Sequence, residues 1–232
     1  SSTYKLTDER YAGWATGAQH TLLYARLSSV NSDAVAQKLT AMEAGEDAET
    51  FASGMAAIST TLMALLNAGD HIVASRNIYG GSHNMLNLTM PRFGITTTFV
   101  DPRDPQAFAE AIRPETRLVF AETLGNPGIE VLDIAAVANV AHDAGLPLAV
   151  DSTFATPVIQ RPLELGVDYV MQSTTKFYDG HNITVGGAIA AADQTLYENI
   201  KHYQNVHGNI MSPQNAFYTL QTAKTMGLRI RK

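Results

Sequence analysis

A lysine and an aspartate, each placed just after a short apolar run, suggest one kind of chemistry. Lys176 follows the apolar residues 169–171 after a short polar turn, and Asp151 directly follows the apolar residues 146–150. A lysine amine can hold pyridoxal phosphate as a Schiff base, and a carboxylate beside the pyridine nitrogen keeps that nitrogen protonated. The pair therefore indicates a site for pyridoxal 5'-phosphate in which Lys176 is the point of attachment. An exposed lysine and a helix-capping aspartate are the simpler interpretations.

Hydroxyl groups and a glycine near these two residues can bind the phosphate of such a cofactor. Ser173 and Thr175 place hydroxyls in the turn that carries Lys176. Ser53-Gly54-Met55 opens a helical pattern, where glycine allows close backbone approach and free N–H groups at the helix N-terminus favour a phosphate. An ordinary serine cap explains the same three residues, so this motif alone does not decide between binding and capping.

Two further positions suit the ring of the cofactor. Tyr79, followed by Gly80-Gly81, is a candidate aromatic lid over the pyridine ring. Glu122 and Asn126 follow the strand-like residues 117–121, where a polar side chain can reach the ring hydroxyl. A tyrosine packed at a strand end and a turn-forming Asn126-Pro127 are the alternatives.

The elements that must hold these residues alternate between strands and helices. Strand-like runs occur at residues 71–74, 95–100, 117–121, 146–150, 168–171 and 186–192, and helical patterns at 56–66, 81–90, 104–112, 134–144, 195–203 and 213–228. This alternation predicts βαβ units and a mainly parallel sheet. Ligands of such sheets gather at the carboxyl ends of the strands. Because Asp151 and the turn of Lys176 both lie at such ends, we expect the fold to bring them together.

Composition excludes several classes of protein. The chain of 232 residues is 45% hydrophobic, has a formal net charge of −6 and contains no cysteine. It therefore has no disulfide framework, no thiolate nucleophile and no cysteine-type zinc site, and its charge disfavours a nucleic-acid surface. The histidines show no metal-binding spacing, so no metal is expected. No run approaches the ~18 apolar residues of a membrane span, the polar N-terminus shows no signal peptide, and a cytoplasmic location is expected.

Taken in chain order, the motifs resemble those of a known family. The resemblance is to the Cys/Met-metabolism family of PLP-dependent enzymes, which contains cystathionine γ-synthase, cystathionine γ- and β-lyases, methionine γ-lyase and O-acylhomoserine sulfhydrylase. It runs from about residue 20 to the C-terminus. The motifs that carry it are Phe51-Ala52-Ser53-Gly54-Met55-Ala56-Ala57-Ile58, Tyr79-Gly80-Gly81, Glu122-Thr123-Leu124-Gly125-Asn126-Pro127, Asp151-Ser152-Thr153-Phe154-Ala155-Thr156-Pro157 and Ser173-Thr174-Thr175-Lys176.

The resemblance implies a fold and a set of cofactor contacts. The fold would be a PLP-dependent transferase-like (fold type I) α/β domain, with a mainly parallel seven-stranded sheet flanked by helices. Backbone N–H groups of Gly54 and Met55 would bind the phosphate, and Asn126 would contact the ring hydroxyl. The full set of implied cofactor-binding residues within one chain is Ser53, Gly54, Met55, Tyr79, Asn126, Asp151, Thr153, Ser173, Thr175 and Lys176.

The resemblance also implies a second subunit. Tyr24 and Arg26 are similar to the family's Tyr-x-Arg pair, which reaches into the neighbouring subunit's site and clamps its phosphate. A homodimer or homotetramer is therefore expected. A solvated surface arginine is the simpler interpretation of Arg26.

Three regions are expected along the chain. Residues 1–50 would form a partial N-terminal arm and first helix, residues 51–195 the PLP-binding large domain, and residues 196–232 helices that lead toward a C-terminal domain. Because family members are longer, we expect that C-terminal domain to be absent from this chain. It carries the arginine that binds the substrate's α-carboxylate, so the chain is expected to be a fragment.

The expected activity is γ-elimination or γ-replacement on small amino acids derived from methionine or homoserine, through a Schiff base on Lys176 and with Tyr79 as an acid at the leaving group. The sequence departs from the family after Arg26, where Leu27-Ser28-Ser29-Val30 replaces Gly-Asn-Pro-Thr, and at Gly81, where methionine γ-lyases often have cysteine. These differences leave the substrate open, as well as the choice between elimination and replacement. Another fold type I enzyme and a PLP-binding fragment without full activity are the alternatives.

Overall fold

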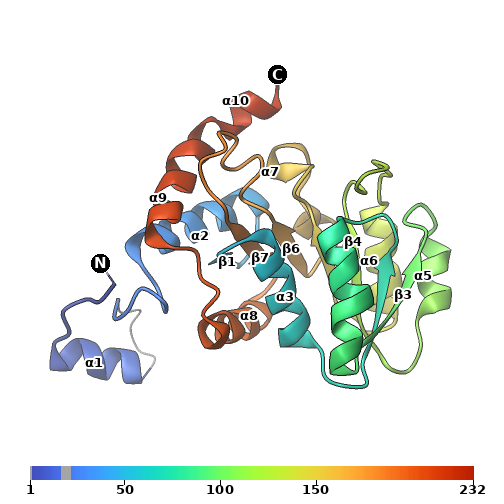
Figure 1. The fold of residues 1–232 in the computed structure, drawn as a ribbon, viewed down its shortest axis with the longest axis horizontal. Helices are drawn as coiled ribbons and strands as arrows, with labels where there is room; N and C mark the ends of the chain where they lie inside the picture. The colour runs from blue at the N-terminus through green and yellow to red at the C-terminus, as the bar shows by residue number, and fades with distance from the viewer. Residues whose placement is uncertain (1, 17–21) are drawn as a thin grey trace.

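A seven-stranded sheet runs through the computed structural model, which describes residues 2–16 and 22–232 (Figure 1). The strand order is β1-β7-β6-β5-β4-β2-β3. Strands β2 to β6 pair in parallel, and β7 is antiparallel to both β1 and β6. The predicted mainly parallel sheet is therefore confirmed. The strands are β1 (Asp47–Phe51), β2 (His71–Ser75), β3 (Thr96–Val100), β4 (Thr116–Glu122), β5 (Leu148–Asp151), β6 (Tyr169–Gln172) and β7 (Gly187–Ala191).

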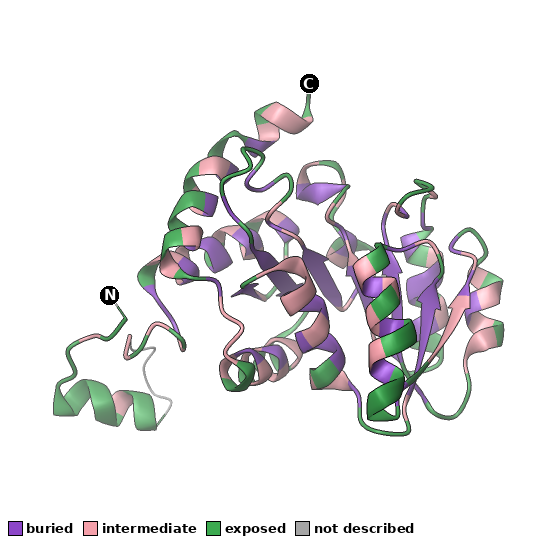
Figure 2. Ribbon diagram, viewed as in Figure 1, coloured by how far each residue is buried: buried purple, intermediate pink, exposed green. Residues whose placement is uncertain are grey.

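Helices cover both faces of this sheet, and most residues of the strands between them are buried, except in the edge strand β3 (Figure 2). Successive residues of β4 point to opposite faces. Leu118 and Phe120 belong to the core shared with α3 and α8, whereas Val119 and Ala121 belong to the core shared with α5 and α6. The helices are α1 (Asp8–Ala15), α2 (Val30–Glu43), α3 (Gly54–Leu65), α4 (Gly80–Asn84), α5 (Pro105–Ala111), α6 (Ile134–Asp143), α7 (Thr156–Ile159), α8 (Gln194–His207), α9 (Pro213–Thr222) and α10 (Met226–Ile230).

Side-chain caps set the starts of the main helices. Ser53 accepts a hydrogen bond from the N–H of Ala56 at the start of α3, and Asp133 and Asp193 cap α6 and α8 in the same way. Each cap satisfies an N–H group that the first helical turn leaves unpaired. Strand β1 runs in the same direction as β6, because both are antiparallel to β7. Its carboxyl end, and with it the start of α3, therefore lies at the same edge of the sheet as the ends of β4, β5 and β6.

Some segments differ from their predicted structure. The helix expected over residues 81–90 is broken into α4, a π-helix at Met85–Thr89 and a 3₁₀ helix at Met90–Phe93. Pro91 has no N–H group to continue an α-helix, and Gly94 ends the segment with a φ of +77°. The helix expected over residues 213–228 divides at a 3₁₀ turn, Ala223–Thr225, into α9 and α10.

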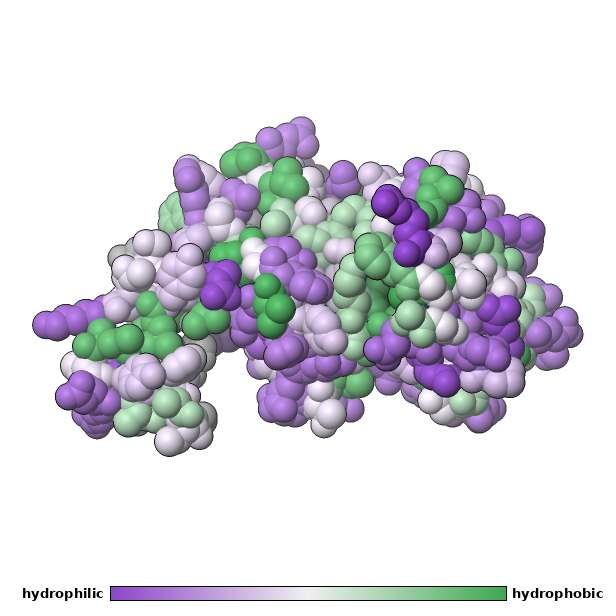
Figure 3. Space-filling view, turned by 60° about the horizontal axis from the view of Figure 1, so that its bottom comes forward, coloured by the Kyte–Doolittle hydropathy of each residue, from purple (hydrophilic) through white to green (hydrophobic). Residues whose placement is uncertain are grey.

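The N-terminal segment lies apart from the sheet (Figure 1). Helix α1 buries none of its residues. Apolar surface gathers beside this segment at the left of Figure 3. The start of the family resemblance, near residue 20, lies outside the described residues. Strand β1 crosses the domain boundary placed at residue 51, so the three-region division stays a prediction. Among the helices that the structure describes, none is long and apolar enough to cross a membrane.

Candidate active site

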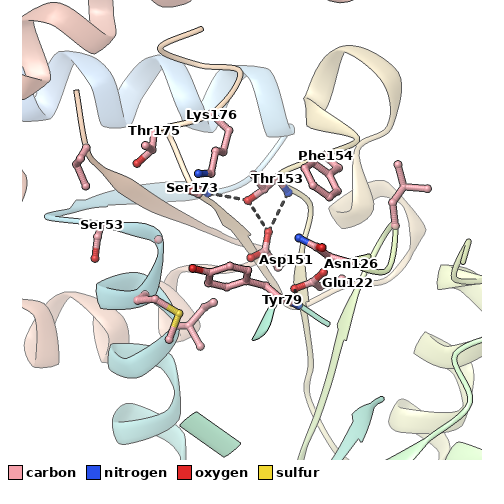
Figure 4. Close-up of a pocket in the computed structure, with 15 residues that line it drawn as sticks. Ser53, Tyr79, Glu122, Asn126, Asp151, Thr153, Phe154, Ser173, Thr175 and Lys176 are labelled. Carbon is pink, nitrogen blue, oxygen red and sulfur yellow. Dashed lines mark hydrogen bonds between the residues drawn. The ribbon is translucent and has the colours of Figure 1, made fainter. Parts of the chain in front are cut away.

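A pocket opens at the carboxyl ends of the strands (Figure 4). Ten of the twelve residues that the resemblance assigns to the cofactor line it, and so does Glu122. They come from strand ends, the loops after them and the first turn of α3. Tyr24 and Arg26 do not line it. The full lining is Ser53, Gly54, Met55, Ile58, Tyr79, Glu122, Leu124, Asn126, Asp151, Thr153, Phe154, Ser173, Thr175, Lys176 and Val185. The fold therefore gathers the residues expected to act within one chain.

Asp151 is held in place by Thr153. The Asp151 Oδ1 atom accepts hydrogen bonds from the Thr153 N–H at 2.9 Å and from the Thr153 hydroxyl at 2.6 Å. The same hydroxyl accepts a hydrogen bond from the Ser173 N–H at 2.8 Å. Thr153 thus ties the end of β5 to the turn after β6 and orients the Asp151 carboxyl. Its direct contact with a cofactor stays a prediction.

A second carboxyl, that of Glu122, lies beside Asp151. The two residues are register partners on the neighbouring strands β4 and β5. Glu122 Oε1 accepts a hydrogen bond from the Tyr79 N–H at 2.7 Å. The pKa of Glu122 is raised to about 8, mainly by burial and, to a smaller extent, by the neighbouring carboxyl of Asp151. Burial also raises the pKa of Asp151, while the hydrogen bonds from Thr153 lower it.

The start of α3 forms the opposite end of the pocket. The Ser53 hydroxyl accepts from the Ala56 N–H at 3.0 Å, so it serves as the cap that was the simpler interpretation of this motif. The N–H groups of Gly54 and Met55 belong to the first turn and have no partner within the helix. A Cβ atom on Gly54 would lie 2.8 Å from the Ser173 Cβ atom. Only glycine therefore lets the helix start approach Ser173 this closely.

Hydrogen bonds between the Thr175 side chain and the backbone of Gly186 fix the loop that carries Lys176. The Thr175 hydroxyl donates to the Gly186 carbonyl at 3.2 Å and accepts from the Gly186 N–H at 3.0 Å. These bonds hold the Thr175 hydroxyl within the chain, so its expected phosphate contact stays a prediction. Lys176 itself is exposed, and its amine points into the pocket (Figure 4). The lysine is thus free to reach a ligand between Ser53 and Asp151.

A buried carboxyl beneath this loop was not predicted. Glu43, the last residue of α2, accepts hydrogen bonds from the Gln172 amide at 2.8 Å and from the Tyr178 hydroxyl at 3.3 Å. These two partners lie on either side of Lys176 in the chain. Burial raises the pKa of Glu43 to about 7, against the hydrogen bonds from Gln172 and Tyr178. No local sequence signal marks Glu43, because both partners are distant in the sequence.

Tyr24 and Arg26 lie side by side away from the pocket. The Arg26 guanidinium carbon is 5.4 Å from the centre of the Tyr24 ring, and its Nη1 atom donates to the Asn205 carbonyl at 2.6 Å. The Tyr24 side chain is 43% exposed. Neither residue contributes to the pocket of its own chain, so their expected role in a neighbouring subunit stays a prediction.

The donor groups of the pocket fit pyridoxal phosphate. Unpaired N–H groups at the start of α3 suit the phosphate, and the Asp151 carboxyl suits the ring nitrogen. Lys176 reaches into the pocket from one side, and the Tyr79 ring lies across from it, between Ser53 and Asp151 (Figure 4). The four lining residues to which sequence reasoning assigned no role are all apolar: Ile58, Leu124, Phe154 and Val185. Phe154 lies three residues after Asp151 in the motif of residues 151–157, and that spacing is the sequence signal that could have identified it.

Comparison with known proteins gives the same assignment for the whole chain. The family model described as "Cys/Met metabolism PLP-dependent enzyme" matches residues 1–232. A probable cystathionine gamma-synthase of Herpetosiphon aurantiacus is 40% identical over 231 residues, which is 100% of this chain and 70% of the relative. A cystathionine gamma-lyase of Bacillus subtilis is 39% identical over 229 residues, which is 99% of this chain and 58% of the relative.

The fold agrees with that of a solved relative. The crystal structure of cystathionine gamma-lyase from Lactobacillus plantarum, complexed with L-serine, matches with a TM-score of 0.92 and 35% identity. The match covers 98% of this chain and 57% of that chain, so this chain spans little more than half the length of the Bacillus and Lactobacillus proteins. The chain therefore belongs to the family of Cys/Met metabolism PLP-dependent enzymes, and its cofactor is pyridoxal 5'-phosphate.

Proposed function

We propose that the protein catalyses γ-elimination or γ-replacement on amino acids derived from methionine or homoserine, with the cofactor attached to Lys176. The observation that carries this proposal is the position of the Lys176 amine opposite Asp151 in one pocket at the strand ends (Figure 4). The similarity to a probable cystathionine gamma-synthase and to a cystathionine gamma-lyase supports the γ-carbon as the place of reaction.

The residues at the ring end hold and move protons. Bound pyridoxal phosphate supplies an electron sink for negative charge at the substrate's α-carbon. The Asp151 carboxylate keeps a proton on the ring nitrogen, and Thr153 holds that carboxylate in position through two hydrogen bonds. The Lys176 Nζ atom would hold the cofactor and would take the proton from the substrate's α-carbon.

Tyr79 is placed to act on the leaving group. Its side chain is 50% exposed and lines the pocket, so the phenol faces the space that a substrate would occupy. The Tyr79 hydroxyl gives a proton to the group that leaves the γ-carbon. Leu124, Phe154 and Val185 line the same pocket with apolar surface, which favours the methylene chain of the substrate and excludes water.

The proposal includes an assembly of at least two subunits. The N–H groups of Gly54 and Met55 and the Ser173 hydroxyl bind the phosphate from within the chain, and Tyr24 and Arg26 of a second copy complete the site. Two observations support this arrangement: Tyr24 is exposed, and Arg26 does not line the pocket of its own chain. The active unit is then a homodimer or homotetramer. The cytoplasmic location stays a prediction.

A substrate panel tests the reaction. Purified protein loaded with pyridoxal phosphate is given methionine, cystathionine, O-acetylhomoserine and O-succinylhomoserine, each with and without sulfide. Release of an α-keto acid and ammonia without sulfide marks elimination, and a new sulfur-containing amino acid formed with sulfide marks replacement. Turnover that requires an amino acceptor would instead point to an aminotransferase and contradict the proposal.

A second candidate is a PLP-binding fragment without full activity. The chain spans 58% and 57% of the Bacillus and Lactobacillus proteins, so cofactor binding and turnover are tested separately. In the same panel, this candidate predicts bound pyridoxal phosphate but no turnover of any γ-substituted amino acid.

A further inference from the structure

Glu122 is a buried carboxyl in the pocket wall with an unusual partner. It is 6% exposed, and its Oε1 atom accepts a hydrogen bond from the backbone N–H of Tyr79 at 2.7 Å. Tyr79 stands at the N-cap position of α4, and its side chain makes no capping hydrogen bond. The bond from Glu122 therefore fixes the backbone from which the exposed Tyr79 ring projects.

The ring of Tyr79 has little freedom on one side. A Cβ atom on Gly81 would lie 2.5 Å from the Tyr79 Cε1 atom and 3.2 Å from the Met55 sulfur. The ring thus lies directly over Gly81 and near α3. This contact leaves no room for a side chain at position 81. Because the ring is carried by the Tyr79 backbone, a small rotation of that backbone would move the ring relative to the pocket.

Glu122 also sits beside the carboxyl that must stay charged. Asp151 receives two hydrogen bonds from Thr153, whereas Glu122 receives one from Tyr79. Two neighbouring buried carboxyls do not both ionise readily, and the one with more donors keeps the charge. Burial and the Asp151 carboxyl raise the pKa of Glu122, consistent with a proton held on Glu122.

We propose that Glu122 is a positioning residue that anchors the Tyr79 backbone and thereby sets the tilt of the phenol against the cofactor ring. In its neutral form it does so without competing with Asp151 for the ring nitrogen. The inference rests on the proposed function only in that the pocket binds pyridoxal phosphate, and it does not depend on which substrate reacts.

Two variants separate the anchoring bond from the volume of the side chain. Glu122→Gln keeps an oxygen that accepts from the Tyr79 N–H, and Glu122→Met keeps a similar volume without an acceptor. The readouts are the Kd for pyridoxal phosphate alone and the visible circular dichroism of the bound cofactor. We expect Glu122→Met to weaken binding about tenfold, because the Tyr79 N–H loses its partner, and to change the dichroism. Glu122→Gln stays within about twofold of the wild type in both.

A double-mutant cycle tests whether the effect passes through Tyr79. If Glu122 acts by placing the ring, Glu122→Met costs no further affinity once Tyr79→Ala has removed that ring. Glu115→Ala, an exposed residue directly before the first residue of the same strand, is the control and leaves both readouts unchanged. Far-ultraviolet circular dichroism confirms that each variant folds.

Several results would overturn the inference. Additive losses in the cycle, unchanged dichroism in Glu122→Met, or an equal loss in Glu122→Gln would each show that Glu122 does not act through the Tyr79 backbone. Failure of the wild type to bind pyridoxal phosphate would overturn both proposals. A wild type that binds the cofactor but turns over no γ-substituted amino acid, with the cycle non-additive, would overturn the proposed function alone.

Discussion

The strand-end half of the site and the Tyr24–Arg26 pair differ in what holds them. Asp151, Thr153 and Ser173 are joined by short hydrogen bonds at neighbouring strand ends. Tyr24 and Arg26 contact each other and the Asn205 carbonyl, away from the pocket. The parallel sheet thus builds the ring-binding half from within one chain, while the phosphate clamp is proposed to come from a second chain. Variants in each half should therefore fail in different ways.

The largest effect is expected from Lys176→Ala in the strand-end half. This variant removes the only group proposed to bond covalently to the cofactor, so the visible absorbance of lysine-bound pyridoxal phosphate and all turnover are lost. Absorbance spectra and the substrate panel measure the two losses. Lys224→Ala, an exposed lysine on the turn between α9 and α10, is the control and keeps both signals. If Lys176→Ala kept the absorbance of lysine-bound cofactor and normal turnover, Lys176 would not be the residue that binds the cofactor.

A smaller effect, on stability, is expected from the carboxyl beneath the lysine loop. Burial raises the pKa of Glu43 from 4.5 to about 7 in the folded protein. The folded state therefore binds more protons than the unfolded state between these values, and Glu43 loses its stabilising contribution as the pH rises through 7. The full difference is about 3 kcal/mol. The strand-end half should thus loosen as the pH rises.

Glu43→Gln isolates this contribution. Glutamine keeps an acceptor for Gln172 and Tyr178 and is uncharged at every pH. We expect the free energy of unfolding of the wild type to fall relative to that of Glu43→Gln as the pH rises from 4.5 to above 7, as measured by urea unfolding. Glu46→Gln, which changes an exposed neighbour and keeps Glu43, is the control: its free energy of unfolding should change with pH in parallel with that of the wild type. Parallel curves for the wild type and Glu43→Gln would mean that Glu43 is ionised across the range.

Sequence reasoning worked best where the signal was local. Strand ends follow from apolar runs, so the positions of Asp151, Ser173 and Lys176 at one edge could be predicted. Strand β1 could not be predicted, because its sequence carries two acids. One of them, Glu49, is buried and forms an ion pair with Lys201 of α8. Such pairing between distant segments has no periodicity to detect.

The same limit explains what was missed within the site. Glu122 was expected to contact the cofactor's ring hydroxyl, and its hydrogen bond to the Tyr79 backbone depends on how the loop after β2 meets the end of β4. Glu43 reaches Gln172 and Tyr178 across the interior. In both cases the residue type was visible in the sequence, but the partner was set by the packing of distant elements.

The smallest effect is expected in the other half, from Arg26→Ala. The guanidinium carries five N–H donors, and its Nη1 atom donates to the Asn205 carbonyl at 2.6 Å. If a second copy presents this group to a bound phosphate, its loss weakens pyridoxal phosphate binding about tenfold. Titration of the variant with the cofactor measures the change. Arg92→Ala, an exposed arginine in another region, should leave the affinity unchanged.

Mixed assemblies decide which chain supplies Arg26. When Lys176→Ala and Arg26→Ala subunits are co-expressed, one site of each mixed pair has an intact lysine from the second and an intact arginine from the first. Part of the activity should then appear at the pyridoxal phosphate concentration that the wild type needs, below the higher concentration that Arg26→Ala alone needs. Lys176→Ala mixed with Asp151→Asn is the matched control. Both of those residues line the pocket of their own chain, so no mixed site is whole and activity stays low. Activity that appears only at the higher cofactor concentration of Arg26→Ala alone would mean that Arg26 acts in its own chain, and the contrast between the halves would disappear.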